Sequence, residues 1–195
     1  MIRGRGAGPS GASAFRELAA LVDGSEFGTR TSKDLAQQVE ECVDGLALLQ
    51  ARGTTPGPSS CTGLAGTWRL LYTSEASVQS IVRGLPVQVV LQTVELSADG
   101  RAGTVTNRME FSVLGAAIES AGPVEPAPDA PRRLVYTADS RLAFEALGGR
   151  LQLSMGPPTR GLWSGAVYLE RACRVMRNSR GDTIVLERAD DDDDA

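Results

Sequence analysis

The segment Leu64-Ala65-Gly66-Thr67-Trp68-Arg69-Leu70-Leu71-Tyr72-Thr73-Ser74 decides how the rest of the sequence is interpreted. Large side chains stand at every second position, Trp68, Leu70 and Tyr72, and a glycine precedes them. Side chains alternate between the two faces of a β-strand. The spacing therefore predicts a strand over 66–73 with its three bulky residues on one face, and we assign that face to the interior.

The same period of two continues to the end of the chain. Further strands are predicted over 86–96, 103–113, 115–121, 132–138, 141–146, 149–155, 166–176 and 183–188. Short strands with little helical pattern between them predict an all-β barrel or sandwich. The proline-rich residues 122–131 are expected to form an exposed excursion. Residues 156–165 are expected to form a loop that carries Leu162 and Trp163 to the mouth of a barrel or to a membrane surface.

Two helical patterns precede the first strand. Apolar residues recur with helical spacing from Phe15 to Val22, and Gly24 and Gly28 interrupt the pattern. A second pattern follows Ser32, a favoured N-cap, and repeats every three or four residues to Leu49. We expect amphipathic helices that need an apolar surface to pack against.

These patterns divide the chain into four parts. Residues 1–12 are interpreted as a disordered arm or the remnant of an organelle-targeting segment, because they contain arginines and no acidic residue. Residues 13–52 form the helical N-terminal element, and 53–63 have the composition of a linker. Residues 62–188 form the β-domain, and 189–195 form an acidic, disordered tail.

Composition excludes several classes of function. The 24 acidic residues include the five aspartates at 190–194, so the remainder carries 19 acidic against 20 basic residues, which argues against a nucleic-acid surface. No apolar run is long enough to span a membrane, so a soluble protein is expected. Histidine is absent, which removes the usual base of nucleophilic enzymes and the commonest metal ligand. No metal site, cofactor or catalytic residue is predicted.

The three cysteines have no CxxC spacing. Free thiols in a reducing compartment are the favoured interpretation, and a disulfide between Cys61 and Cys173 is the alternative. Cys42 lies on the apolar face of the second helical pattern and is expected to be a small buried residue.

Apolar residues of the predicted strands point either to a filled core or to a ligand pocket. A barrel of about eight strands is just wide enough for either. The candidate pocket residues are Leu70, Tyr72, Met109, Phe111, Ile118, Tyr136, Phe144 and Leu153.

The chain resembles the plastid lipid-associated protein (fibrillin) family. The resemblance rests on Leu64 to Ser74, on the helix before it, and on the closing strands Tyr168-Leu169-Glu170, Arg174-Val175-Met176-Arg177 and Ile184-Val185-Leu186-Glu187-Arg188. A Gly-x-Trp strand also begins lipocalin-type barrels. The resemblance implies a mainly β protein: a lipocalin-like antiparallel barrel preceded by one or two α-helices. It also implies that Arg188 packs across the Trp68 indole as a structural barrel floor.

The family resemblance implies a function as well. Members are thought to bind or organise lipids, quinones or carotenoids, peripherally at thylakoids or plastoglobules of plastids, without catalysis. The expected partners are apolar small molecules, lipids or a lipid monolayer. One alternative is a structural coat or scaffold protein with a filled barrel. Another is a lipid isomerase or cyclase, for which the candidate groups are Tyr72, Tyr136 and Glu145.

Overall fold

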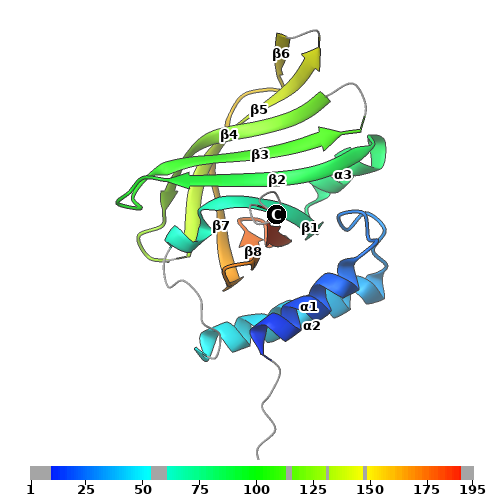
Figure 1. The fold of residues 1–195 in the computed structure, drawn as a ribbon, viewed down its shortest axis with the longest axis vertical. Coiled ribbons are helices and arrows are strands. Elements are labelled where there is room, and N and C mark those ends of the chain that lie inside the picture. Colours follow the sequence, from blue (N-terminus) through cyan, green and yellow to red (C-terminus); the bar gives the residue numbers. More distant parts are fainter. Residues whose placement is uncertain (1–9, 54–60, 113–115, 131, 147–148, 190–195) are drawn as a thin grey trace, which may run out of the picture.

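A computed structural model describes residues 10–53, 61–112, 116–130, 132–146 and 149–189 (Figure 1). Along the chain the elements are α1 (Gly11–Val22), α2 (Lys33–Ala51), η1 (Cys61–Leu64, a 3₁₀ turn), β1 (Gly66–Thr73), α3 (Ala76–Gly84), β2 (Val87–Leu96), β3 (Gly103–Phe111), β4 (Ala116–Pro126), β5 (Arg133–Ala146), β6 (Gly149–Ser154), β7 (Thr159–Leu169), β8 (Cys173–Asn178) and β9 (Thr183–Arg188).

The strands form a closed antiparallel barrel, which confirms the predicted fold class. Neighbouring strands pair around the ring in the order β1, β2, β3, β4, β5, β7, β8, β9, and β9 pairs with β1. The long strand β5 belongs to two pairings, because its first half pairs with β7 and its second half with β6. The β5–β6 hairpin therefore extends beyond the ring (Figure 1). Closure leaves the eight ring strands without a free edge.

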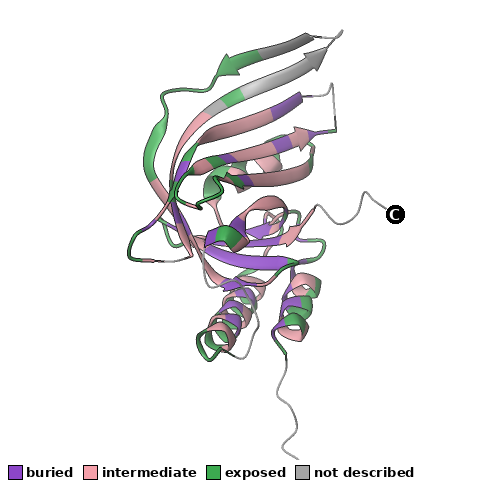
Figure 2. Ribbon diagram, turned by 60° about the vertical axis from the view of Figure 1, so that its left-hand side comes forward, coloured by how far each residue is buried: buried purple, intermediate pink, exposed green. Residues whose placement is uncertain are grey.

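Helices α1 and α2 pack on the outside of the barrel, below β1 and β8 in Figure 1 and at the lower end of the molecule in Figure 2. Ser32 caps α2 as predicted, since its hydroxyl accepts a hydrogen bond from the Leu35 N–H at 3.1 Å. The apolar faces of both helices and the outward side chains of four strands form one buried cluster. Its members are Phe15, Leu18, Val22, Val39, Val43, Leu46, Tyr72, Tyr168, Cys173, Val175 and Val185. The outer face of the barrel thus provides the apolar surface against which the amphipathic helices were expected to pack.

Polar contacts fix α2 in place on the barrel. The Glu40 carboxylate accepts hydrogen bonds from the Arg177 guanidinium at 2.6 Å and from the Thr183 hydroxyl at 2.7 Å. At the other end of the helix, the Gln50 side chain accepts a hydrogen bond from the Leu169 N–H at 2.9 Å. These contacts set the rotation of α2 about its axis, which apolar packing alone leaves loosely defined.

The connection between α1 and α2 touches the end of β1. The Gly28 backbone has a φ of 95°, and a Cβ at this position would lie 2.4 Å from the Thr73 carbonyl oxygen. Only glycine combines this conformation with this approach. The Thr73 N–H donates to the Phe27 carbonyl oxygen at 3.2 Å, so the connection adds to the sheet at this point.

Two predicted loops are wrong in part. Residues 122–126 belong to β4, and the β4–β5 pairing skips Gly122 and Pro123, so the missing proline N–H interrupts no ladder bond there. Residues 159–165 belong to β7, and a turn at 170–172 separates it from β8, where one strand over 166–176 was predicted. Helix α3 was not predicted.

A bulge in β1 corrects the predicted face of Tyr72. Leu70 pairs with Leu186 and Tyr72 with Val185, so the register shifts by one residue between them. A one-residue shift turns a side chain to the opposite face of the sheet. Trp68 and Leu70 therefore face the interior, whereas Tyr72 is buried beneath α1 and α2.

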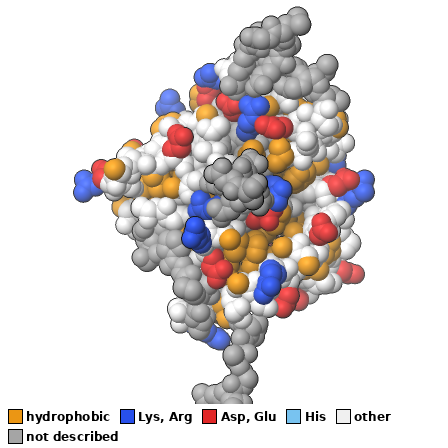
Figure 3. Space-filling model, in the orientation of Figure 1, with side chains coloured by type: hydrophobic (Ala, Val, Ile, Leu, Met, Phe, Trp, Pro, Cys, Tyr) orange, Lys and Arg blue, Asp and Glu red, His pale blue; other side chains and the backbone are white. Residues whose placement is uncertain are grey.

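The outer surface carries both signs of charge. On the face shown in Figure 3, acidic and basic side chains are interspersed around apolar ones.

Candidate ligand-binding cavity

The barrel encloses a cavity of about 380 Å³ between its floor and α3. Its wall is mixed. Apolar side chains of several strands contribute Leu70, Val90, Met109, Ile118, Tyr136, Leu162, Ile184 and Leu186, and polar or charged ones contribute Gln92, Asn107, Arg108, Ser120, Thr159, Asn178 and Arg180. Val78 and Ile81 of α3 line its opposite end, which we call the mouth. The turn η1 precedes β1, and α3 follows it. The floor and the mouth therefore lie at opposite ends of β1 (Figure 1).

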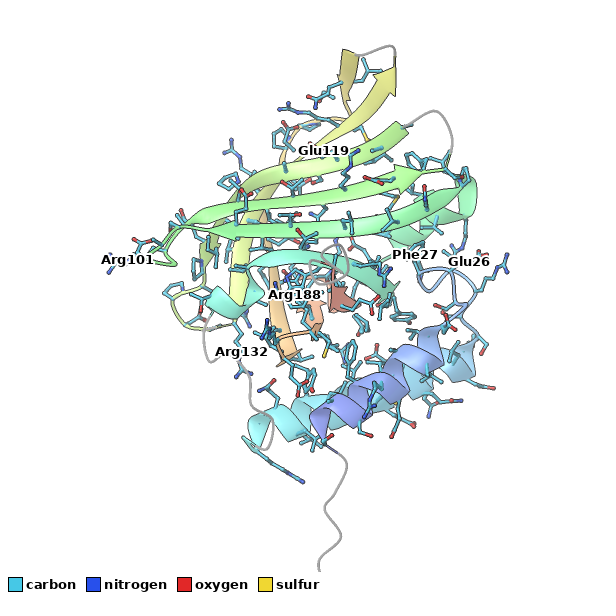
Figure 4. The ribbon with its side chains drawn as sticks, in the orientation of Figure 1. Glu26, Phe27, Arg101, Glu119, Arg132 and Arg188 are labelled. Carbon is cyan, nitrogen blue, oxygen red and sulfur yellow. The ribbon has the colours of Figure 1, made fainter. Side chains whose placement is uncertain are left out.

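Trp68 forms the floor of the barrel and is fully buried. Its indole N–H donates to the Leu64 carbonyl oxygen of η1 at 3.0 Å. The Arg188 guanidinium lies 4.3 Å from the centre of the ring, beside β1 (Figure 4), as the family resemblance implied. Arg188 also donates to the carbonyl oxygens of Arg171 at 2.8 Å and Ala65 at 3.2 Å. The indole, the cation and η1 together close this end of the barrel.

A second arginine, which the sequence analysis missed, contacts the same indole. The Arg174 guanidinium lies 4.3 Å from the Trp68 ring centre, and its side chain is fully buried inside the barrel. It donates to the Leu64 carbonyl oxygen at 3.2 Å and to the Gln92 side-chain oxygen. Burial, with a smaller contribution from Arg188, lowers the pKa of Arg174.

Half of the eight predicted pocket residues are brought together at the cavity. Leu70, Met109, Ile118 and Tyr136 line it, and Leu162 joins them from β7. Burial raises the pKa of the Tyr136 phenol, which therefore stays neutral at physiological pH.

The remaining predicted residues lie elsewhere. Phe111 packs with Met109 and Ala116 in a cluster beside the cavity. Tyr72 lies under the helices, and the Leu153 side chain is 50% exposed on β6, outside the ring of strands. The side chain of Phe144 is outside the described residues.

Trp163 lies on the outer surface, neither at the mouth nor in a loop. It follows Leu162 on β7, so the two side chains point to opposite faces. The Arg133 guanidinium lies 4.3 Å from its ring centre. Trp163 and Arg133 line a second, outer hollow together with Gly165, Ala166 and Arg177.

The thiols take no part in the cavity lining. None of the three cysteines forms a disulfide; Cys61 and Cys173 are buried, and Cys42 is only half-buried. Burial, followed by the nearby Glu170 and Glu187, raises the pKa of Cys173 to about 12. Such a thiol is inert at neutral pH.

Among the described residues, no helix is long and apolar enough to cross a membrane. In the same part of the chain, no group of three or more cysteine, aspartate or glutamate side chains could hold a metal ion.

An eight-stranded closed barrel, with a Gly-x-Trp floor under an arginine and an internal cavity of ligand size, defines a lipocalin-like protein. Sequence comparison identifies the family within this class. The model of the PAP_fibrillin family matches residues 12–127, more than half of the chain, and the chain belongs to this family of plastid lipid-associated proteins.

A similar relative is the probable plastid-lipid-associated protein 11, chloroplastic, of Arabidopsis thaliana. The two are 27% identical over 184 residues, which cover 90% of this chain and 79% of the relative. The similarity thus extends beyond the segment that the family model matches.

Proposed function

We propose that this protein is a non-enzymatic carrier or organiser of apolar molecules in plastids, acting peripherally at thylakoids or plastoglobules. Lipids, quinones or carotenoids are the proposed ligands. The observation that carries the proposal is the cavity of about 380 Å³ inside the barrel, whose lining includes apolar side chains of many strands and of α3. Family membership and the chloroplastic relative support the location and the lipid-related role.

The cavity volume limits what can enter. Binding pockets for small molecules measure about 300–1,000 Å³, so this one is at the small end. It accommodates a small ligand or one end of a longer one. Each Å² of apolar ligand surface that leaves water contributes about 25 cal/mol, less the cost of ordering the ligand.

Helix α3 is the element through which a ligand would pass. None of its residues is fully buried, although Val78 and Ile81 line the cavity. The Gln79 side chain holds it to the carbonyl oxygens of Gly28 at 3.2 Å and Thr73 at 2.9 Å. Elements with few buried contacts open at low free-energy cost.

Native mass spectrometry tests the proposal. The full chain is incubated with a total plastid lipid extract, re-purified and compared with an Ile118→Trp variant, whose larger side chain occupies part of the cavity. We expect a discrete bound mass in defined stoichiometry on the natural chain and its loss from the variant. No bound mass on either protein would contradict a carrier function.

A structural coat or scaffold role is the second candidate, and one observation favours it. Leu153 of β6 and Met155, which follows the end of β6, are 50% and 53% exposed, and β6 projects beyond the ring of strands (Figure 1). Flotation with galactolipid-coated triolein droplets tests this role. Surface docking predicts that a Leu153→Ser, Met155→Ser double variant loses droplet association while the Ile118→Trp variant keeps it.

The proposed catalytic groups of a lipid isomerase or cyclase are not gathered at one place. Tyr136 lines the cavity, and Tyr72 lies outside it under the helices. The side chain of Glu145 is outside the described residues.

A further inference from the structure

Polar side chains form a row across three neighbouring strands of the barrel wall. Gln92 of β2, Asn107 of β3 and Ser120 of β4 are successive cross-strand partners, and all three line the cavity. The inward residues on either side of Gln92 are Val90 and Val94, both apolar. A polar group placed inside such an interior costs free energy unless it is hydrogen-bonded.

The row begins at the buried cation Arg174. This side chain has no exposed surface and, within the described part of the chain, forms no ion pair. Its Nε–H has no hydrogen-bond partner, and its two terminal nitrogens donate to Leu64 and Gln92. A guanidinium can only donate hydrogen bonds. Gln92 must therefore turn its amide oxygen toward Arg174.

The orientation of the Gln92 amide sets the orientation of the Asn107 amide. With its oxygen on Arg174, Gln92 turns its NH₂ group toward Asn107, and the Gln92 Nε2 to Asn107 Oδ1 distance is 2.6 Å. Asn107 is thereby fixed as the acceptor of this hydrogen bond. Its own NH₂ group is then the far end of a relay that runs from Arg174 through Gln92 to Asn107. In the described part of the chain this NH₂ group has no protein hydrogen bond. The positive charge of Arg174 thus polarises two amides in line, and the relay ends in N–H donors at the cavity wall.

We propose that this relay makes the cavity selective for apolar ligands that carry a carbonyl oxygen, with that oxygen accepting a hydrogen bond from the Asn107 NH₂ group. The inference rests on the proposed function, since it names the ligand chemistry of the same cavity. A carbonyl satisfies the donors at a small desolvation cost, whereas an ionised carboxylate loses far more hydration on entering the barrel. A ligand without an oxygen leaves the donors unpaired.

The test uses two ligands with one carbon skeleton. Decanophenone carries a carbonyl where decylbenzene carries a methylene group, and each displaces the fluorescent probe N-phenyl-1-naphthylamine from the full chain. The readout is the ratio of the two dissociation constants. The informative variant is Gln92→Glu, because a carboxylate accepts from both Arg174 and Asn107. Asn107 must then reverse its amide and present its oxygen to the cavity.

We expect Gln92→Glu to reduce the preference for decanophenone over decylbenzene by about fivefold or more, the loss of one neutral hydrogen bond. Gln38→Glu, the same substitution on the exposed face of α2, should leave the ratio unchanged. If Gln92→Glu does not fold by circular dichroism, Asn107→Leu should produce the same loss for the ketone with unchanged or tighter decylbenzene binding.

The possible outcomes separate the two proposals. Binding of both ligands with a ratio that neither variant changes would overturn the carbonyl selectivity and leave the carrier function standing. Failure of probe and ligands to bind to the natural chain would overturn the carrier function itself.

Discussion

Replacing Arg188 with alanine should destabilise the barrel by opening its floor. The guanidinium lies 4.3 Å from the Trp68 ring centre and donates to two backbone carbonyl oxygens, at 2.8 and 3.2 Å. The substitution removes all three interactions while leaving the indole in place. Its effect therefore reports on what the cation adds to the floor.

The magnitude follows from these contacts. A partly desolvated cation–π contact contributes about 1 kcal/mol, and each hydrogen bond from a charged, half-exposed donor contributes on the order of 1 kcal/mol. The like charge of Arg174 partly offsets this sum, since Arg188 disfavours the charged form of Arg174. We expect Arg188→Ala to lower the free energy of unfolding by about 2 kcal/mol.

Urea unfolding followed by far-UV circular dichroism measures this difference. Arg133→Ala is the matched control, because its guanidinium lies at the same 4.3 Å from Trp163 but on the outer surface. Arg133→Ala should lower the free energy of unfolding by about 1 kcal/mol or less. In a Trp163→Phe background, the emission of Trp68 should shift to the red on Arg188→Ala as water reaches the indole.

The two arginine variants also define the refuting result. Equal losses of stability for Arg188→Ala and Arg133→Ala, with no shift in Trp68 emission, would show that Arg188 is an ordinary surface cation. The floor of the barrel would then not depend on the Arg188 cation.

Three other predictions concern the cavity, the helix contact and the thiol. Ile118→Trp should weaken N-phenyl-1-naphthylamine binding at least tenfold in a fluorescence titration and change the free energy of unfolding by no more than about 1.5 kcal/mol, since the new ring enters existing space. Glu40→Ala, which removes the 2.6 Å contact with Arg177, should cost about 1–2 kcal/mol in urea and speed amide exchange in α2, whereas Glu41→Ala should cost under about 0.5 kcal/mol. Cys173 has a pKa raised to about 12 in the folded state, so unfolding releases its proton above pH 9 and stability should fall from pH 9 toward 12. Cys173→Ala should flatten that part of the stability profile, and an unchanged slope would contradict the burial argument.

The floor of the barrel illustrates what could be predicted from sequence. Trp68 and Leu70 were placed inward by the period of two, and the family resemblance placed Arg188 over the indole. The first inference is local, because side chains alternate between the two faces of a strand. The second depends on position, because the last strand pairs with the first. The inward positions of Met109 and Ile118 followed from the same alternation.

Local irregularities defeated the same reasoning elsewhere. The bulge after Leu70 reversed the face of Tyr72, because one shifted residue exchanges the two sides of a strand. Pro123 was taken as a loop signal, yet it lies in β4 where the pairing with β5 skips it. Helix α3 is only nine residues long, so its apolar positions repeat over little more than two turns, too few to separate a helix from its neighbouring strands by sequence.

The sequence by itself determined the alternation of side chains in the strands, the helices before the first strand and the Gly-x-Trp motif. Each of these features depends only on residues close together in the chain, and together they specify a lipocalin-like barrel. Only the tertiary structure decided how the interior is polarised. Arg174, Gln92 and Asn107 stand on three different strands, and their isolated positions predict nothing about one another. Closure of the barrel brings the cation across the interior to the amides. Its lack of acceptor atoms then dictates which way each amide points.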